Sequence, residues 1–230
     1  NLSCEDREDI HSGLFTSGGH TSQMRGIDVS NTRNLLEKIT GLIADDMITM
    51  NQSNQIKAPN AVVTFSQASK LPLLSEYCSA LSGVSTGELN RFTRKFWEVT
   101  SFGVNWSFSQ TSSSGEEYFN GFSNAFFWQK GCGELYELAE SVKHLNHAAQ
   151  NWQRGRPSWG KPGVSISKMS QLKASIYSGQ IYDENCCAII PNDIRDLPAL
   201  WAYCSSPEYN SEVRKINQSI LVQTKYMINI

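Results

Sequence analysis

The chain has 230 residues, of which 40% are hydrophobic and 18% charged, which is the composition of a globular protein with one large domain or two small ones. This composition excludes disorder over most of the chain, and no apolar run approaches the roughly 20 residues that cross a bilayer. The net charge of −2 excludes a uniformly basic protein.

The polar, acidic N-terminus predicts the cellular location. It has neither the basic start nor the apolar centre of a signal peptide, so we expect a cytoplasmic protein without a membrane partner. The first residue is Asn1 rather than Met, and we interpret the chain as a fragment of a longer protein.

Hydrophobic periodicity predicts the elements of the first half of the chain. Residues 33–50 have apolar side chains at helical spacing, with Asn31 or Thr32 as the expected cap. Alternating apolar and polar residues over 104–109 indicate a half-buried strand. The predicted elements are helices over 33–50, 71–81 and 135–145, and strands over 61–65, 104–109 and 122–129.

The second half of the chain contains more strands. Pro207 follows Ser206, which is the usual order of a helix cap and a first helical residue. The predicted elements are strands over 164–168, 175–183 and 186–190, and helices over 197–204 and 207–216. Helices and strands do not alternate regularly, so we expect an α+β fold with a mixed β-sheet core, flanking helices and long polar loops.

The residues that usually carry catalysis or bind metal show no recognisable pattern. The six cysteines include no Cys-x-x-Cys pair, so we expect reduced and mostly buried thiols. His144 and His147 lie at i, i+3 but lack a third ligand. Nucleotide-binding glycine motifs are also missing from the sequence. We therefore predict no metal, no cofactor and no covalent chemistry for this chain itself.

Charge is distributed unevenly along the chain. Residues 1–60 hold eight acids and five bases, whereas residues 143–173 hold six bases and no acid. A run of basic residues without acids suits binding to a polyanion such as DNA. Each phosphate that a basic side chain neutralises releases counterions, which favours binding. The same window contains groups that can stack on bases or read their edges, namely Gln150, Asn151, Trp152, Gln153 and Trp159. A solvated basic loop is the alternative interpretation, and the sequence leaves both open.

Three segments carry a family resemblance. Residues 82–99 read SGVSTGELNRFTRKFWEV, residues 159–169 read WGKPGVSISKM followed by SGQIYD at 178–183, and residues 197–210 read LPALWAYCSSPEYN followed by VRKINQ at 213–218. In this order and spacing they resemble the target-recognition region of large adenine-specific DNA methyltransferases. These are type IIG restriction-modification and BREX-type phage-defence proteins with a Taq-like C-terminal specificity domain. The resemblance covers roughly residues 50–220.

The resemblance implies DNA recognition without methyl transfer. The family's catalytic half binds S-adenosylmethionine and holds a flipped adenine with an Asn-Pro-Pro motif, which is missing here. We therefore expect residues 1–50 to be a lead-in from a missing catalytic domain and residues 51–230 to be a DNA target-recognition domain. The expected partners are double-stranded DNA and the missing methyltransferase domain or subunit.

The resemblance and the basic window together predict the DNA-contacting residues. A Thr-Gly turn lets backbone amides approach a phosphate, and arginine can pair bidentately with guanine. We expect Ser165 and Ser167 to share one strand face near Lys161, with Val164 and Ile166 facing the core. The predicted DNA-binding residues are Thr86, Gly87, Asn90, Arg91, Arg154, Arg156, Lys161, Ser165, Ser167 and Lys168.

Other interpretations of these segments stay open. The Thr86-Gly87 turn fits a plain structural turn equally well, and Phe92, Phe96 and Trp97 are expected in the core. The chain could instead be a protein-interaction module that docks a separate methyltransferase or defence subunit, which a large exposed apolar patch would favour. A hydrolase would need acids around a metal, for example Glu116, Glu117 and Asp183, and no sequence feature supports it.

Overall fold

The computed structural model describes residues 23–29, 32, 34–44, 47–52, 71–113, 115, 117–145 and 148–230. The chain divides into two compact units, Asn1–Ala68 and Ser69–Ile230. The predicted strand over 61–65 lies outside the described residues. The assignment of the first 50 residues to a lead-in and of the rest to a DNA-recognition domain stays a prediction.

The described residues of the first unit form a helix and two short strands. The strands β1 (Gln23–Gly26) and β2 (Ile48–Asn51) pair antiparallel, and helix α2 (Leu35–Ala44) lies between them in sequence. The cap prediction was wrong, because the side chain of Asn34 accepts the amide of Glu37 at 2.9 Å. The apolar side chains that predicted α2 are exposed, so its amphipathic face is not buried within this unit.

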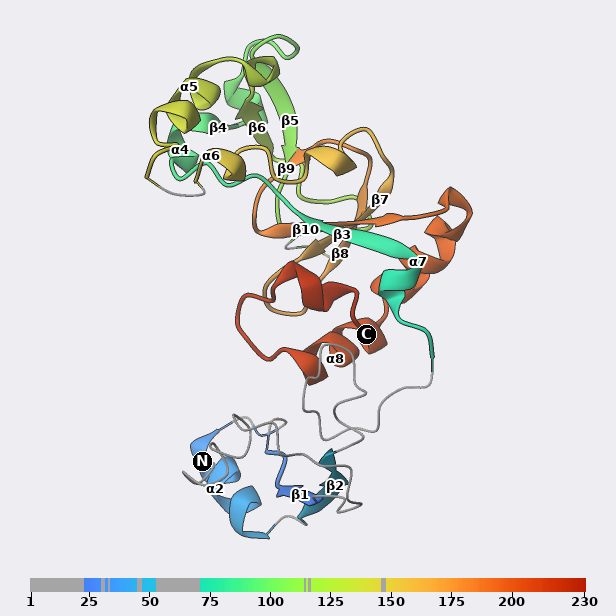
Figure 1. Cartoon of the computed structure of the whole chain (residues 1–230). Coiled ribbons are helices and arrows are strands. Elements are labelled where there is room, and N and C mark those ends of the chain that lie inside the picture. Colours follow the sequence, from blue (N-terminus) through green and yellow to red (C-terminus); the bar gives the residue numbers. More distant parts are fainter. Residues whose placement is uncertain are drawn as a thin grey trace, which may run out of the picture. The chain divides into compact units, whose positions relative to one another are not determined.

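The second unit is built on two four-stranded sheets (Figure 1). The first sheet has the order β3-β10-β7-β8 and every pairing in it is antiparallel. Its strands are β3 (Cys78–Ser82), β7 (Gly163–Ser167), β8 (Ala174–Tyr177) and β10 (Cys186–Pro191). Strand β3 is therefore an edge strand of this sheet.

The second sheet has the order β4-β6-β5-β9 and is mixed. Its strands are β4 (Thr93–Lys95), β5 (Trp106–Gln110), β6 (Asn124–Phe127) and β9 (Ile181–Tyr182). The first three pair antiparallel, and β9 runs parallel to β5. Because β9 leads directly into β10, one continuous segment belongs to both sheets. The predicted α+β class with a mixed sheet core is confirmed.

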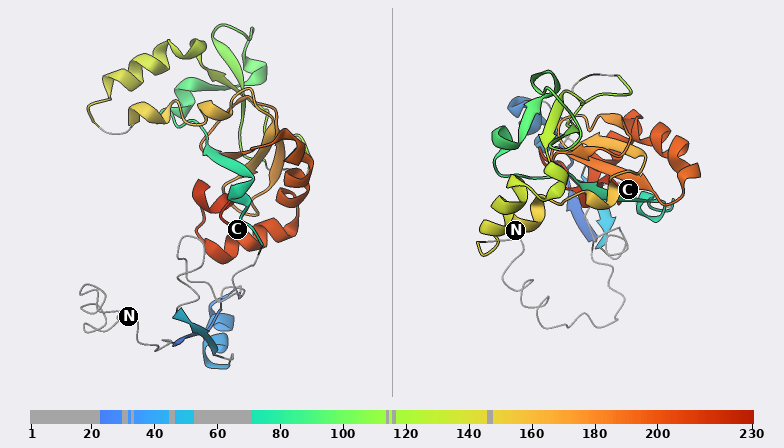
Figure 2. Two further views of the ribbon diagram at one scale, coloured as in Figure 1. Left: turned by 45° about the vertical axis from the view of Figure 1, so that its right-hand side comes forward. Right: turned by 90° about the horizontal axis from the view of Figure 1, so that it is seen from above.

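Helices flank both sheets (Figures 1 and 2). The α-helices of the second unit are α4 (Leu89–Phe92), α5 (Glu134–Ser141), α6 (Ala148–Asn151), α7 (Leu197–Cys204) and α8 (Pro207–Ile216). Short 3₁₀ turns are η2 (Leu74–Glu76), η3 (Phe96–Glu98), η4 (Gln129–Gly131), η5 (Arg156–Ser158), η6 (Ile194–Asp196) and η7 (Thr224–Met227). Ser206 caps α8 as predicted, since its hydroxyl accepts the amide of Tyr209.

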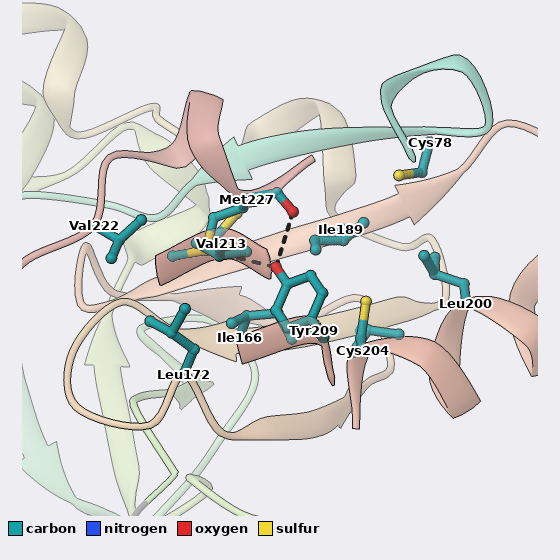
Figure 3. Packing of buried hydrophobic residues seen from close by; sticks show 12 residues of the cluster. Cys78, Ile166, Leu172, Ile189, Leu200, Cys204, Tyr209, Val213, Val222 and Met227 are labelled. Atoms are coloured by element: carbon teal, nitrogen blue, oxygen red, sulfur yellow. Dashed lines mark hydrogen bonds between the residues drawn. The ribbon is translucent and has the colours of Figure 1, made fainter. Parts of the chain in front are cut away.

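The main core lies between the first sheet and the helices α7 and α8 (Figure 3). Val164, Ile166 and Ile189 project from the sheet into this core, and Tyr209 and Val213 project from α8. The hydroxyl of Tyr209 donates a hydrogen bond to the carbonyl of Met227 at 2.9 Å, which satisfies the polar end of a buried ring.

The first sheet is also covered on its other face. Tyr177, Cys186, Ala188 and Ile190 form a second buried cluster there with Tyr182 of β9. A third cluster fills the space between the second sheet and α5, where Phe92, Phe126, Leu135 and Trp152 are buried. Three adjoining clusters therefore fix the second unit, and both faces of β7 are inaccessible to solvent.

Four predictions of elements or burial need correction. The helix predicted over 33–50 ends at Ala44, and residues 48–50 belong to β2, which pairs with β1. The helix predicted over 71–81 is the η2 turn followed by β3, because β3 gains a full antiparallel ladder with β10. The strand predicted over 175–183 is interrupted at Gly179, whose φ is +96°, and its two halves join different sheets. Phe96 and Trp97 were expected in the core, but both are exposed.

Candidate nucleic-acid interface

The central part of the basic window, residues 152–162, forms the loop between α6 and β7, which we call the basic loop. Arg154, Arg156 and Lys161 are exposed in this loop. None of the three forms an ion pair with a described residue. Arg156 Nη1 donates only to Gln153 Oε1 at 3.4 Å. The loop thus presents three positive charges that no carboxylate of the described chain neutralises, as binding to a polyanion requires.

A groove of about 590 Å³ runs beside this loop. One wall is the end of the edge strand β3, at Leu81 and Ser82. The other wall is formed by Gln150 of α6 and, from the basic loop, by Gln153, Arg154, Gly155 and Pro157. Two amides and a guanidinium line the groove, and these are the planar groups that pair with base edges in the major groove. We call this feature the basic-loop groove.

The two tryptophans of the window support the loop instead of facing a ligand. Trp152 is buried against Trp128 and Tyr136, with ring centroids 5.4 and 5.7 Å apart. Trp159 is partly buried and stands edge-on to Trp128 at 5.0 Å. Both rings therefore anchor the loop to the core, and neither is a platform on which a base could stack.

Three of the predicted contact residues are buried. Ser165 and Ser167 lie on the face of β7 opposite to Val164 and Ile166, but that face is covered as well. Ser167 Oγ accepts the amide of Ser113 at 3.0 Å. Ser165 and Ser167 share one face of β7, as expected, but that face is buried because the first sheet is packed on both sides.

Lys168 also points inward and is only 8% exposed. Its Nζ donates to Ser82 Oγ at 3.2 Å, so this lysine lies behind the β3 wall of the basic-loop groove. This hydrogen bond fixes the position of the Ser82 hydroxyl, while Lys168 itself has little contact with solvent. We assign Lys168 to the support of the wall.

The Thr86-Gly87 turn lies outside the basic loop and is held by local contacts. Thr86 Oγ1 accepts the amide of Glu88 at 3.2 Å. Gly87 has φ of +71° with open space around it, so the turn needs glycine for its backbone alone. Asn90 is exposed on α4, and its backbone carbonyl accepts a hydrogen bond from Arg94.

Arg91 is held by two carboxylates. Its guanidinium donates to Glu88 and to Glu134, each at 3.2 Å. These hydrogen bonds raise the pKa of Arg91 above its ordinary value. The neighbouring acids also cancel much of the positive potential that an approaching phosphate would meet. The structure thus distinguishes Arg91 from the three unpaired bases of the basic loop.

The acids weighed for a hydrolytic site do not assemble into a metal site in the described chain. Asp183 accepts from Thr111 Oγ1 at 2.5 Å and from the Asn185 amide at 3.0 Å. Burial raises the pKa of the Asp183 carboxyl. Glu117 accepts a hydrogen bond from Asn120 Nδ2 at 2.6 Å, and Glu116 lies outside the described residues. Among the described residues, no group of three or more His, Cys, Asp or Glu side chains could hold a metal ion.

Sequence reasoning found the loop but missed the opposite wall. Ser82 was not predicted as a site residue. The segment before it, residues 71–81, was predicted as a helix, whereas the structure has an edge strand that ends at Ser82. The pairing of β3 with β10 joins residues about a hundred positions apart in sequence, and local periodicity carries no signal for it.

Comparisons with known proteins give a partial likeness to solved structures. No family model matches the chain, and no curated protein matches it. Among solved structures, the chain is similar in part to the type IIL restriction-modification enzyme MmeI in complex with DNA. The TM-score is 0.43 and the sequence identity 13%, over 66% of this chain and 25% of the MmeI chain. The chain therefore matches about a quarter of that enzyme's length.

Within the part of the chain that the structure describes, none of the helices has the length and apolar character needed to cross a bilayer.

Proposed function

We propose that this chain binds double-stranded DNA and selects its sequence, as the target-recognition part of an adenine-N6 DNA methyltransferase or restriction-modification protein. The observation that carries the proposal is the basic-loop groove. There, unpaired Arg154, Arg156 and Lys161 stand beside a channel lined by Gln150 and Gln153. The three ordered sequence motifs support the same function. A separate methyltransferase domain or subunit would supply S-adenosylmethionine and the transfer step.

Different side chains in and beside the groove would contact different parts of the DNA. Arg154, Gln150 and Gln153 line it and would contact base edges, which specify sequence. Arg156 and Lys161 lie in the same loop but do not line the groove, so they would neutralise phosphates. The Thr86, Gly87, Asn90 and Arg91 turn remains a second predicted contact. Ser165, Ser167 and Lys168 would act only as buried support.

The test is duplex binding across a salt series. The test variant carries R154Q, R156Q and K161Q, which keep side-chain length but remove three unpaired charges. The matched control carries K143Q, R195Q and K215Q, which remove three exposed charges that are already ion-paired. Each lost phosphate contact lowers the slope of log affinity against log salt by about 0.9. We expect a decrease of about 1.8 for the test variant, because Arg156 and Lys161 would contact phosphates whereas Arg154 would contact base edges, and little change for the control.

Two results would contradict the proposal. One is an equal change of slope in both variants, which would indicate an unspecific response to net charge. The other is the lack of wild-type binding to duplex DNA at low salt, both alone and with the methyltransferase subunit present.

A second candidate function is docking of another protein. It is favoured by exposed aromatic side chains around the second sheet, where Trp97 is 65% exposed and Phe102 stacks on half-exposed Phe108 at 4.1 Å. Exposed apolar side chains that form a contiguous patch are typical of a protein-binding surface. The variant W97S/F108S should then lose capture of a methyltransferase subunit while it retains duplex binding. Unchanged capture would exclude this surface as the docking site.

A further inference from the structure

Three buried hydroxyl groups lie beneath the basic-loop groove. Ser158 of η5 and Tyr182 of β9 are 0% exposed, and Tyr177 of β8 is 1% exposed. Ser158 Oγ lies 3.1 Å from the hydroxyl oxygen of Tyr182 and 3.4 Å from that of Tyr177. A serine from the basic loop therefore meets two tyrosines from two different strands.

Each hydroxyl also reaches a backbone carbonyl. Ser158 donates to Gly155 at 2.5 Å, Tyr182 to Leu81 at 3.0 Å, and Tyr177 to Gln180 at 2.8 Å. Each hydroxyl has one proton, and these three carbonyl bonds use all three protons. The contacts from Ser158 Oγ to the two tyrosine hydroxyls are therefore hydrogen bonds only where a proton is shared between two acceptors. Every carbonyl bond thus depends on one particular hydroxyl group.

Two of these bonds end on opposite walls of the groove. Leu81 belongs to the β3 wall and Gly155 to the loop wall. Tyr182 donates to the first through its hydroxyl and lies close against the second, because a Cβ added to Gly155 would lie 2.6 Å from the Tyr182 hydroxyl oxygen and 2.8 Å from its Cζ. The third bond, from Tyr177, ends at Gln180 in the β8–β9 turn, outside the groove.

We propose that Tyr182 and Ser158 are positioning residues that set the separation of the two groove walls and so orient Arg154 and Gln153 toward DNA. This inference depends on the proposed function for its ligand. Tyr182 fixes the carbonyl of Leu81, and Ser158 fixes the turn that begins at Gly155. Neither side chain reaches solvent, so both act on DNA through the groove alone.

The ionisation of the tyrosines agrees with a permanent donor role. Burial raises the pKa of Tyr177 to about 12 and raises that of Tyr182 further above its ordinary value. Both hydroxyl groups therefore stay protonated at any pH where the protein is studied, and the bond to Leu81 persists throughout.

The experiment compares Y182F with Y177F in the full chain. Both variants lose one buried tyrosine hydroxyl that donates to a carbonyl, so thermal unfolding should show similar losses of stability. Only Y182F releases a groove wall. We expect Y182F to weaken duplex binding by roughly fivefold or more, a factor that one lost hydrogen bond can produce, whereas Y177F binds within twofold of wild type. S158A should behave like Y182F.

A second measurement does not depend on DNA. Amide hydrogen exchange over residues 150–157 should be faster in Y182F than in Y177F, and equal exchange in the two would overturn the inference. Equal duplex affinity of Y182F and Y177F, with clear wild-type binding, would also overturn it while leaving the proposed function intact. If wild-type protein binds no duplex, the proposed function fails, and the exchange comparison still decides whether Tyr182 orders the loop.

Discussion

Replacing Gly155 with alanine should destabilise the protein through one defined contact. The backbone of Gly155 has φ of +77°, which costs an L-residue about 1–2 kcal/mol. The new Cβ would also lie 2.6 Å from the Tyr182 hydroxyl oxygen and 2.8 Å from Cζ, and Tyr182 is fully buried. Overpacking of a closed site adds about 1–3 kcal/mol. The expected loss of unfolding free energy is therefore about 2–5 kcal/mol.

Gly160 provides the matched control. It has the same φ of +77°, but a Cβ there meets nothing within 4 Å. G160A should therefore cost only the backbone strain, about 1–2 kcal/mol, and the difference between the two variants isolates the contact with Tyr182. Urea denaturation of both proteins measures this difference. Equal losses for G155A and G160A would refute the packing of the loop against Tyr182.

Three further predictions concern other parts of the second unit. Y209F leaves the buried carbonyl of Met227 without its donor, so urea denaturation should show a loss of about 1–3 kcal/mol; a loss below the error of the method would contradict this bond. The raised pKa of Asp183 means that the folded state holds this proton more tightly than the unfolded state, so its contribution to stability is present in acid and is lost as pH rises through the folded pKa. D183N should flatten that part of the stability–pH profile, and an unchanged profile would show that Asp183 does not titrate in this way. Among the described cysteines, exposed Cys132 should react with a maleimide in the native protein, while buried Cys78 and Cys187, whose pKa values rise to about 12, should react only after unfolding, as peptide mapping will show.

The parts of the fold that the sequence predicts are those set by local patterns. The apolar run at 186–190 and the Ser206-Pro207 pair are strong local signals, and they correspond to β10 and the start of α8. Residues 71–81 misled the prediction because the ladder between β3 and β10 outweighs their helical spacing. Long-range pairing of this kind has no counterpart in the periodicity of a single segment.

In the candidate site, too, the sequence predicts local features but not those that depend on contacts between distant segments. Composition identifies the basic loop, since charge and planar side chains are visible in any window of sequence. Accessibility is decided by what covers a strand, so Ser165 and Ser167 could not be recognised as buried before the packing on both faces of β7 was known. The role of Ser158 was equally invisible, because a serine in a polar loop gives no sign that two tyrosines from distant strands surround it.

The groove draws its parts from three distant stretches of chain, and this affects how it can form. Leu81 comes from β3, Gly155 from the loop and Tyr182 from β9. None of these stretches contains both walls. The groove therefore forms only after segments that are far apart in sequence have come together, at the entropic cost of ordering the chain between them. The groove should accordingly be one of the last features to assemble during folding. An isolated peptide that spans residues 150–163 would keep the charges but lack the opposite wall, and would attract DNA without regard to its sequence.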